Sequence, residues 1–118
     1  MRHGVHKGKK FGRTKDQREL MLRNLATSLI LFEKIETTEA KAKQIRGIID
    51  RLITKGKTKD LAARRYLMTF LLHKNAVEKV LRELADKYAT RTSGFTRVMR
   101  LGNRAGDAAP LVRIELVK

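Results

Sequence analysis

The side chains that could carry chemistry in this chain are few, and Gly56-Lys57-Thr58 come closest to a known motif. They match the end of a phosphate-binding loop, in which glycine amides and a lysine surround a nucleotide phosphate. That loop needs a further glycine five positions before Gly56, where Arg51 stands, and a strand in front of it, whereas the pattern here predicts a helix. We therefore expect no nucleotide site.

Metal and acid–base chemistry are equally poorly supported. His3 and His6 are close enough in sequence to share a metal ion, but no third ligand is near them and their surroundings are cationic. The chain has no cysteine, which excludes disulfides, thiol catalysis and the usual zinc sites. The carboxylates are spread as helix caps and ion-pair partners, such as Glu83 with Lys79 or Lys87. The sequence predicts no catalytic residue, no metal, no cofactor and no small-molecule substrate.

Positive charge is the feature that does indicate a function. The 118 residues include 28 Lys and Arg against 12 Asp and Glu, a formal net charge of +16. Seven basic side chains lie in residues 1–18 and six in residues 91–118, where few acids oppose them. A polyanion is the expected partner, bound mainly by the two ends of the chain.

Residues 1–13 are expected to form a basic, extended arm that becomes ordered on a polyanion, although a solvated tail is the alternative. The arm lacks the apolar region of a signal peptide, and no segment is long enough to span a bilayer, so we expect a cytoplasmic protein. Among the aromatic residues, Phe11 alone is placed to stack on an unpaired base. Recognition of folded RNA by shape and backbone therefore fits better than recognition by a sheet of stacking rings.

Residues 14–118 are predicted to form a single α+β domain, in which about four helices pack on a small, roughly three-stranded mixed sheet. Thr14 and Gln17 form a capping box for the first helix, and residues 31–37 form a weakly alternating strand. A second helix begins after Thr37 or Thr38 and ends at Gly56, which is expected to act as its C-terminal cap.

Two further helices follow. The third begins after Thr58 or Asp60. Its expected buried residues are Leu61, Leu67, Met68 and Leu71. The fourth is expected to begin at a capping box made by Asn75 and Glu78. Its apolar stripe consists of Val77, Val80, Leu81, Leu84 and Tyr88.

Two strands are predicted near the C-terminus, in residues 95–101 and 111–117. The second alternates cleanly, with Val112, Ile114 and Leu116 on one side and Arg113 and Glu115 on the other. The first alternates poorly, although its pattern puts Phe95, Met99 and Leu101 on one side. The loop between the strands, residues 102–109, is rich in turn-forming residues.

Several motifs, in this order and at this spacing, give the chain a resemblance to a known family. They are Met1-Arg2-His3, Arg23-Asn24-Leu25-Ala26 with Ser28-Leu29, Thr37-Thr38 with Lys41-Ala42-Lys43, Arg64-Arg65, Gly94-Phe95-Thr96-Arg97, Arg104 with Gly106-Asp107, and Ile114-Glu115-Leu116-Val117. The chain resembles the bacterial ribosomal protein numbered seventeen in the large subunit. Phe95 stands where a tyrosine is expected, and Ser93 where a glycine is expected.

The resemblance implies a structural component of the large ribosomal subunit in the cytoplasm. It implies binding to the major rRNA near the polypeptide exit tunnel, beside neighbouring large-subunit ribosomal proteins, with no membrane and no catalysis. Combining it with the charge pattern, we expect a set of rRNA-binding residues from the arm, the helices and the C-terminal hairpin. They are Arg2, His3, Lys7, Lys9, Lys10, Arg13, Arg23, Asn24, Lys41, Lys43, Arg64, Arg65, Arg91, Arg97, Arg100 and Arg104.

Two other functions remain as alternatives. A general DNA- or RNA-architectural protein would bind duplex DNA equally well and would be absent from ribosomes. A basic amphipathic protein on an anionic membrane is disfavoured, because the helices carry the narrow apolar stripes and capping signals of a globular fold.

Overall fold

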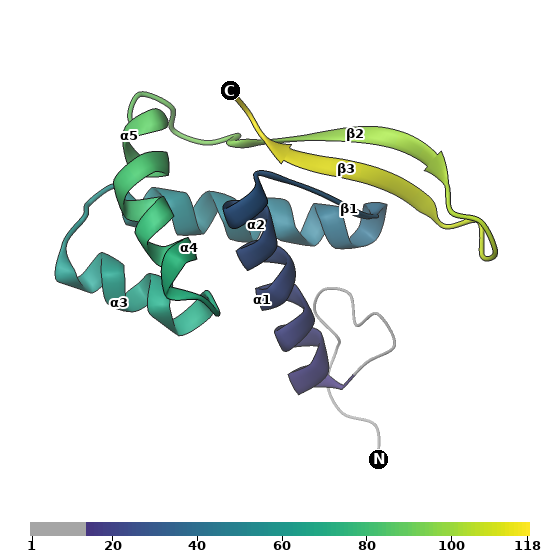
Figure 1. Ribbon diagram of the computed structural model, residues 1–118, viewed down its shortest axis with the longest axis horizontal. Helices are drawn as coiled ribbons and strands as arrows, with labels where there is room; N and C mark the ends of the chain where they lie inside the picture. The colour runs from purple at the N-terminus through teal and green to yellow at the C-terminus, as the bar shows by residue number, and fades with distance from the viewer. Residues whose placement is uncertain (1–13) are drawn as a thin grey trace, which may run out of the picture.

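The computed structural model describes residues 14–118. Its elements are α1 (Lys15–Phe32), β1 (Lys34–Thr38), α2 (Glu39–Gly56), α3 (Leu61–Phe70), α4 (Lys74–Lys79), the π-helical turn η1 (Val80–Leu84), α5 (Ala85–Lys87), β2 (Thr96–Asn103) and β3 (Pro110–Leu116). Because α4, η1 and α5 are contiguous, they form one helix, so this region has four helices and a three-stranded sheet (Figure 1). The predicted α+β class is confirmed.

The sheet has the strand order β1-β3-β2, and both pairings are antiparallel. The expectation of a mixed sheet is therefore wrong. Strands β2 and β3 form a hairpin, which can only be antiparallel. Strand β1 enters on the other edge of β3 and runs opposite to it, from Lys34 beside Glu115 to Thr38 beside Leu111.

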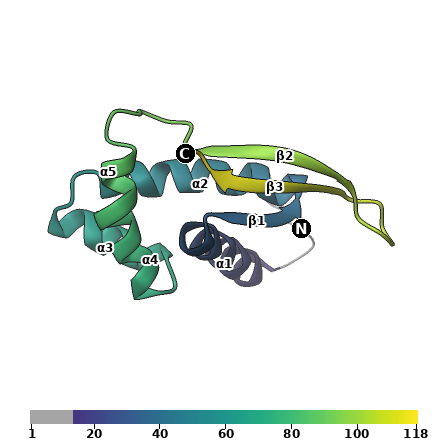
Figure 2. The ribbon, with the colours of Figure 1, turned by 45° about the horizontal axis from the view of Figure 1, so that its top comes forward.

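One face of the sheet is buried against α1 and α2, which lie on the same side of it (Figure 2). Val112, Ile114 and Leu116 point into this core as predicted, with Arg113 and Glu115 on the other face. In the first strand, Phe95 is buried just before β2 begins, but Met99 and Leu101 are exposed. The strand register explains the exposure of Met99, because Val98 and Arg100 pair with the inward-facing Ile114 and Val112, which leaves Met99 beside Arg113 on the outer face. A bulge between Arg100 and Gly102 then interrupts the alternation before Leu101 can rejoin it.

Helix α1 begins as predicted and ends later than predicted. The backbone N–H of Gln17 donates to Thr14 Oγ1 at 3.2 Å, which confirms Thr14 as the N-cap. The helix continues through Leu31 and Phe32, because Leu29 and Ile30 extend its buried stripe. Glu33 then adopts a left-handed conformation (φ 67°) and its N–H donates to the Leu29 carbonyl, which ends the helix. The predicted strand exists, but it begins only at Lys34.

Helix α2 is the central element, in contact with α1, α3, η1 and all three strands. The prediction that Gly56 is its C-terminal cap is wrong, because Gly56 is the last helical residue and Lys57 follows in a right-handed conformation. Gly56 is needed for a different reason. A Cβ atom there would lie 2.6 Å from Val80 Cγ1, so glycine permits the close approach of α2 and η1.

Helix α3 buries fewer residues than its pattern indicates. Asp60 caps it, accepting from the N–H of Ala63 at 2.8 Å. Leu67 and Leu71 are buried, but Leu61 and Met68 are 61% and 59% exposed. Only the stripe that includes Ala63, four residues before Leu67, faces the core.

The last helix begins at Lys74 with His73 as its N-cap. No capping box forms at Asn75 and Glu78, because Asn75 already lies inside the helix and Glu78 pairs with Arg64 of α3. The predicted apolar stripe of this helix is confirmed, since each of its five members is buried.

Replacing Gly56 with alanine tests the packing of α2 against η1. We expect Gly56→Ala to lower the free energy of unfolding by about 1–3 kcal/mol, because the new methyl group collides with a buried valine. Urea denaturation measures this. Gly47→Ala, in the same helix, is the matched control. Its Cβ meets only Arg51 Nη1 at 3.7 Å, so it should raise stability by about 0.5–1 kcal/mol.

The loss should shrink in a Val80→Ala background, in which the colliding methyl group is absent. An equal loss in both backgrounds would contradict a direct clash between the two helices.

Candidate nucleic-acid interface

The β2–β3 hairpin extends beyond α2 at one end of the molecule (Figure 1) and presents three of the predicted arginines. Arg97 pairs across the strands with Glu115. Arg100 Nη2 lies 3.0 Å from Glu39 Oε2, which joins the hairpin to the start of α2. All three arginines, including Arg104 at the tip, are exposed. The hairpin is therefore accessible to phosphates, although its charge is partly balanced by carboxylates.

The tip of the hairpin is closed by its own hydrogen bonds. The N–H of Arg104 donates to the carbonyl of Ala109 at 2.7 Å, and the N–H of Ala108 donates to the carbonyl of Arg104 at 2.9 Å. Arg104 Nε also donates to Asp107 Oδ1 at 3.2 Å. Gly106 has φ 99°, a conformation that favours glycine. The loop therefore holds Arg104 in a defined place instead of leaving it on a free strand end.

These arginines keep their acidic partners ionised. The hydrogen bond from Arg97 lowers the pKa of Glu115. The hydrogen bond from Arg104, together with one from the Ala109 N–H, lowers the pKa of Asp107 to about 2. At neutral pH, a phosphate must therefore approach these guanidinium groups beside a charged carboxylate.

Two of the predicted RNA-binding arginines have structural partners inside the domain. Arg23 Nε donates to the Phe70 carbonyl at 2.7 Å and ties α1 to the end of α3. Arg64 pairs with Glu78 and ties α3 to α4, and this hydrogen bond lowers the pKa of Glu78. Both side chains therefore stabilise helix packing, whatever else they contact.

The remaining predicted residues of the described region lie at the surface to different degrees. Lys43, Arg65 and Arg91 are exposed, as is Asn24, whereas Lys41 is half-buried on a flank of α2. Arg91 lies between α5 and β2, where its carbonyl accepts a hydrogen bond from Lys57 Nζ. The predicted residues of the arm fall outside the described residues, as do His6 and Phe11. They are Arg2, His3, Lys7, Lys9, Lys10 and Arg13.

The predicted residues do not form one patch. The hairpin tip lies beyond the start of α2, where Arg100 contacts Glu39, whereas α3, which carries Arg64 and Arg65, lies at the other end of α2 (Figures 1 and 2). A single ligand that touches both groups must therefore follow the length of α2.

The sequence predicted only part of the surface that lies between the hairpin and α3. Lys43, Arg46, Arg51 and Lys55 all lie on the solvent-facing half of α2, and we call these four residues the α2 basic face. Within residues 14–118, none of the four has a carboxylate oxygen within 4.0 Å. The helical period of the sequence placed Arg46 and Arg51 off the apolar stripe, but only the structure shows that they continue from Lys43.

A shallow pocket of about 470 Å³ borders the α2 basic face where α2 meets α3. Lys55 Nζ lies there 5.5 Å from the centre of the Tyr66 ring. Tyr66 is 37% exposed, and Phe32 at the end of α1 is 68% exposed. The expectation that Phe11 alone could present a ring to a base is therefore wrong. Helical position could have indicated Tyr66, which follows the charged pair Arg64-Arg65 and lies off the buried stripe.

Two other kinds of site are absent from the part of the chain that the structure describes. Residues 14–118 contain no group of three or more His, Cys, Asp or Glu side chains arranged to hold a metal ion. Within the same residues, no helix combines the length and the hydropathy that crossing a bilayer requires.

Comparison with known proteins identifies the family. The ribosomal protein L17 family matches residues 21–117. The chain belongs to this family. It is 53% identical over 109 residues to "Large ribosomal subunit protein bL17" of Desulfitobacterium hafniense, covering 92% of this chain and 97% of the relative. Proteins of the same name are 50% identical over 109 residues in Thermoanaerobacter sp. (92% and 97%) and 47% identical over 119 residues in Staphylococcus epidermidis (92% and 98%).

The family resemblance seen in the sequence is thus confirmed. Members of this family are structural ribosomal proteins, so the chain is not an enzyme.

The ion pair at the hairpin tip predicts a pH dependence. Because the pKa of Asp107 is lowered from 3.8 to about 2, its contribution to stability is present above pH 3.8 and is lost as pH falls towards 2. Carboxyl-carbon NMR should show Asp107 titrating near pH 2. In Arg104→Gln, the midpoint should rise towards 3.8. An unchanged midpoint in that variant would mean that Arg104 does not hold the carboxylate.

Proposed function

We propose that the chain is a structural constituent of the large ribosomal subunit of the cytoplasmic ribosome and binds its major rRNA. The α2 basic face is the observation that carries the rRNA-binding proposal. It has four exposed cations with no carboxylate within 4.0 Å in residues 14–118, on the outer side of the central helix. The names of the family relatives, which are large-subunit proteins, support the same assignment.

Cations of this kind bind RNA by releasing counterions from its phosphates. The four side chains lie on a rigid helix, so they offer a fixed spacing to an RNA backbone instead of a diffuse charge. Arg46 and Arg51 add planar guanidinium groups that bind phosphate oxygens with two parallel hydrogen bonds. The α2 basic face is therefore suited to positioning a folded RNA without reading its sequence.

The hairpin contributes in a second way. The contact of Arg100 with Glu39 places the outer half of β2 beside the start of α2, so an RNA on the α2 basic face can continue along the hairpin towards its tip. Arg97, Arg100 and Arg104 are exposed and can exchange part of their hydrogen bonding from carboxylate to phosphate. Because each phosphate contact replaces a carboxylate contact, these arginines contribute less to the free energy of RNA binding than the cations of the α2 basic face do.

Residues 1–13 are proposed to be a separate basic arm, and residues 14–118 a single rRNA-binding domain. The arm has five Lys and Arg and no acid, which suits a segment that follows an RNA groove. The proposed position near the polypeptide exit tunnel, beside other large-subunit proteins, rests on the family resemblance.

Neutralising the α2 basic face tests the proposal. Each cation that neutralises a phosphate adds about 0.7–0.9 to the salt dependence of log K. We expect Lys43→Gln/Arg46→Gln/Arg51→Gln to weaken binding to large-subunit rRNA and to lower this slope by about 2–3, measured by filter binding at rising salt. The matched control, Lys59→Gln/Lys87→Gln/Lys118→Gln, removes the same charge elsewhere and should change the slope by less than about 1. Equal effects of both triple variants would reject a specific role for α2.

Removing residues 1–13 tests the arm. The deletion removes five Lys and Arg and should lower the slope by up to about 4. The fold of residues 14–118 should persist, since α1 is capped by Thr14. Circular dichroism of the truncated chain serves as the control. An unchanged affinity and slope would show that the arm is a solvated tail.

Salt washing of cell lysates tests the ribosomal assignment. The tagged chain should remain on large subunits through high-salt washing when followed by sedimentation. Release at modest salt into free or DNA-bound fractions would instead favour a general architectural protein.

A further inference from the structure

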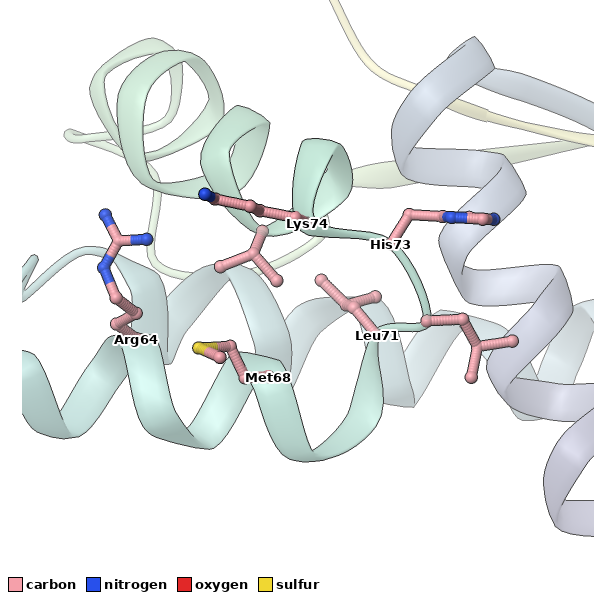
Figure 3. A pocket seen from close by; sticks show the side chains of 7 residues that line it. Arg64, Met68, Leu71, His73 and Lys74 are labelled. Carbon is pink, nitrogen blue, oxygen red and sulfur yellow. The ribbon is translucent and has the colours of Figure 1, made fainter.

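An apolar groove of about 440 Å³ lies between α3 and α4, away from the α2 basic face (Figure 3). Its floor is aliphatic and consists of Met68, Leu71, Leu72 and Val77. Arg64 and Lys74 form its rim, and both side chains extend along the groove, whereas His73 points away from them towards α1.

At Met68 the groove exposes an apolar side chain of the kind that a soluble domain normally buries, whereas Leu71 and Val77 of its floor are themselves buried. Met68 is 59% exposed, and Leu61, seven residues earlier on α3, is 61% exposed. Residues at this spacing lie on the same side of a helix. Apolar exposure that is contiguous and rimmed by polar groups is typical of an interaction site.

The rim has a defined charge. Arg64 is held in place by Glu78, which also forms an ion pair with Arg82, with Nε and Oε1 3.2 Å apart. Lys74 has no carboxylate oxygen within 4.0 Å in residues 14–118, so its ammonium group is available to a partner. An incoming carboxylate would meet Lys74 at the edge of the apolar floor.

The lining favours a protein over RNA as the occupant. It has one ring, that of His73, which points away from the groove towards α1 and so offers no stacking platform to a base inside it. The polar edges of a base would also lose hydrogen bonds against the aliphatic floor. An apolar side chain does not have this cost, and the flexible side chain of Met68 can adapt to its shape.

We propose that this groove docks a segment of a partner protein, which inserts one aliphatic or aromatic side chain over Met68 and Leu72 and places a carboxylate on Lys74. Within the proposed function, the groove would be a contact to a neighbouring protein, distinct from the surfaces that bind rRNA. It needs no bound RNA, so it can be tested on the free chain.

The test uses methyl-carbon NMR of the full chain labelled at methionine. The probe is a six-residue peptide with two central leucines between glutamates. We expect it to shift the Met68 methyl signal in a saturable manner. Met99, an exposed methionine on the outer face of the sheet, is the internal control and should not move. The same peptide with serines in place of leucines should leave Met68 unmoved, which separates apolar docking from attraction by the net charge.

Two variants test the role of the rim. Lys74→Gln should weaken binding of the leucine peptide about two- to fivefold, as expected for an exposed ion pair. Lys118→Gln removes the same charge at the C-terminus and should leave the affinity unchanged. Equal weakening by both variants would contradict a carboxylate site at Lys74.

Three outcomes would overturn the proposal. They are no shift of Met68 with the leucine peptide, an equal shift with the serine peptide, and a shift of Met68 only with a uridine hexanucleotide, which would make the groove an RNA site. Because no rRNA is present, failure here leaves the salt-dependence test of the α2 basic face unaffected.

Discussion

The burial of Phe95 joins the hairpin to the helices, and the placement of the functional surfaces depends on it. The side chain is fully buried, and its ring centre lies 5.1 Å from that of Tyr88. Its N–H donates to Asp50 Oδ1 of α2 at 3.3 Å, and its carbonyl accepts from the N–H of Val117 at 2.9 Å. The Tyr88 hydroxyl donates to the Val117 carbonyl and closes the junction. One residue thus connects α2, the end of the last helix and both ends of the β2–β3 hairpin.

This junction determines which surfaces remain free. With the sheet and the other helices on one side of α2, only the half that carries the α2 basic face is open to solvent. The hairpin leaves the junction at one end, and α3 with its apolar groove lies towards the other. The core therefore separates a cationic surface suited to RNA from an apolar surface suited to a protein. A protein between RNA and protein neighbours in a particle needs such a separation.

Positive charge alone does not identify the binding groups, because the structure contains two kinds of basic side chain. One kind has a carboxylate partner, and the other has none within residues 14–118. Arg64, Arg97, Arg100 and Arg104 have carboxylate partners, and exposed pairs of this kind contribute little to stability. Their larger effect is to fix guanidinium groups in place. Within residues 14–118, the cations of the α2 basic face have no such partners, so no carboxylate there competes with phosphate for them. Arg23, which bonds a backbone carbonyl, belongs to the packing of the helices.

The sequence by itself determined the α+β class, the cap at Thr14, the alternation of β3 and the apolar stripe of the last helix, because caps and periodicity depend on near neighbours. It also determined the family. Only the tertiary structure decided that Gly56 serves packing instead of capping and that Leu61 and Met68 are exposed. It also decided that the hairpin arginines have carboxylate partners, whereas Arg46 and Arg51 have none within the described residues 14–118. Each of these depends on which distant segment lies opposite, such as Val80 facing Gly56 or Glu39 facing Arg100. A local pattern contains no information about that partner.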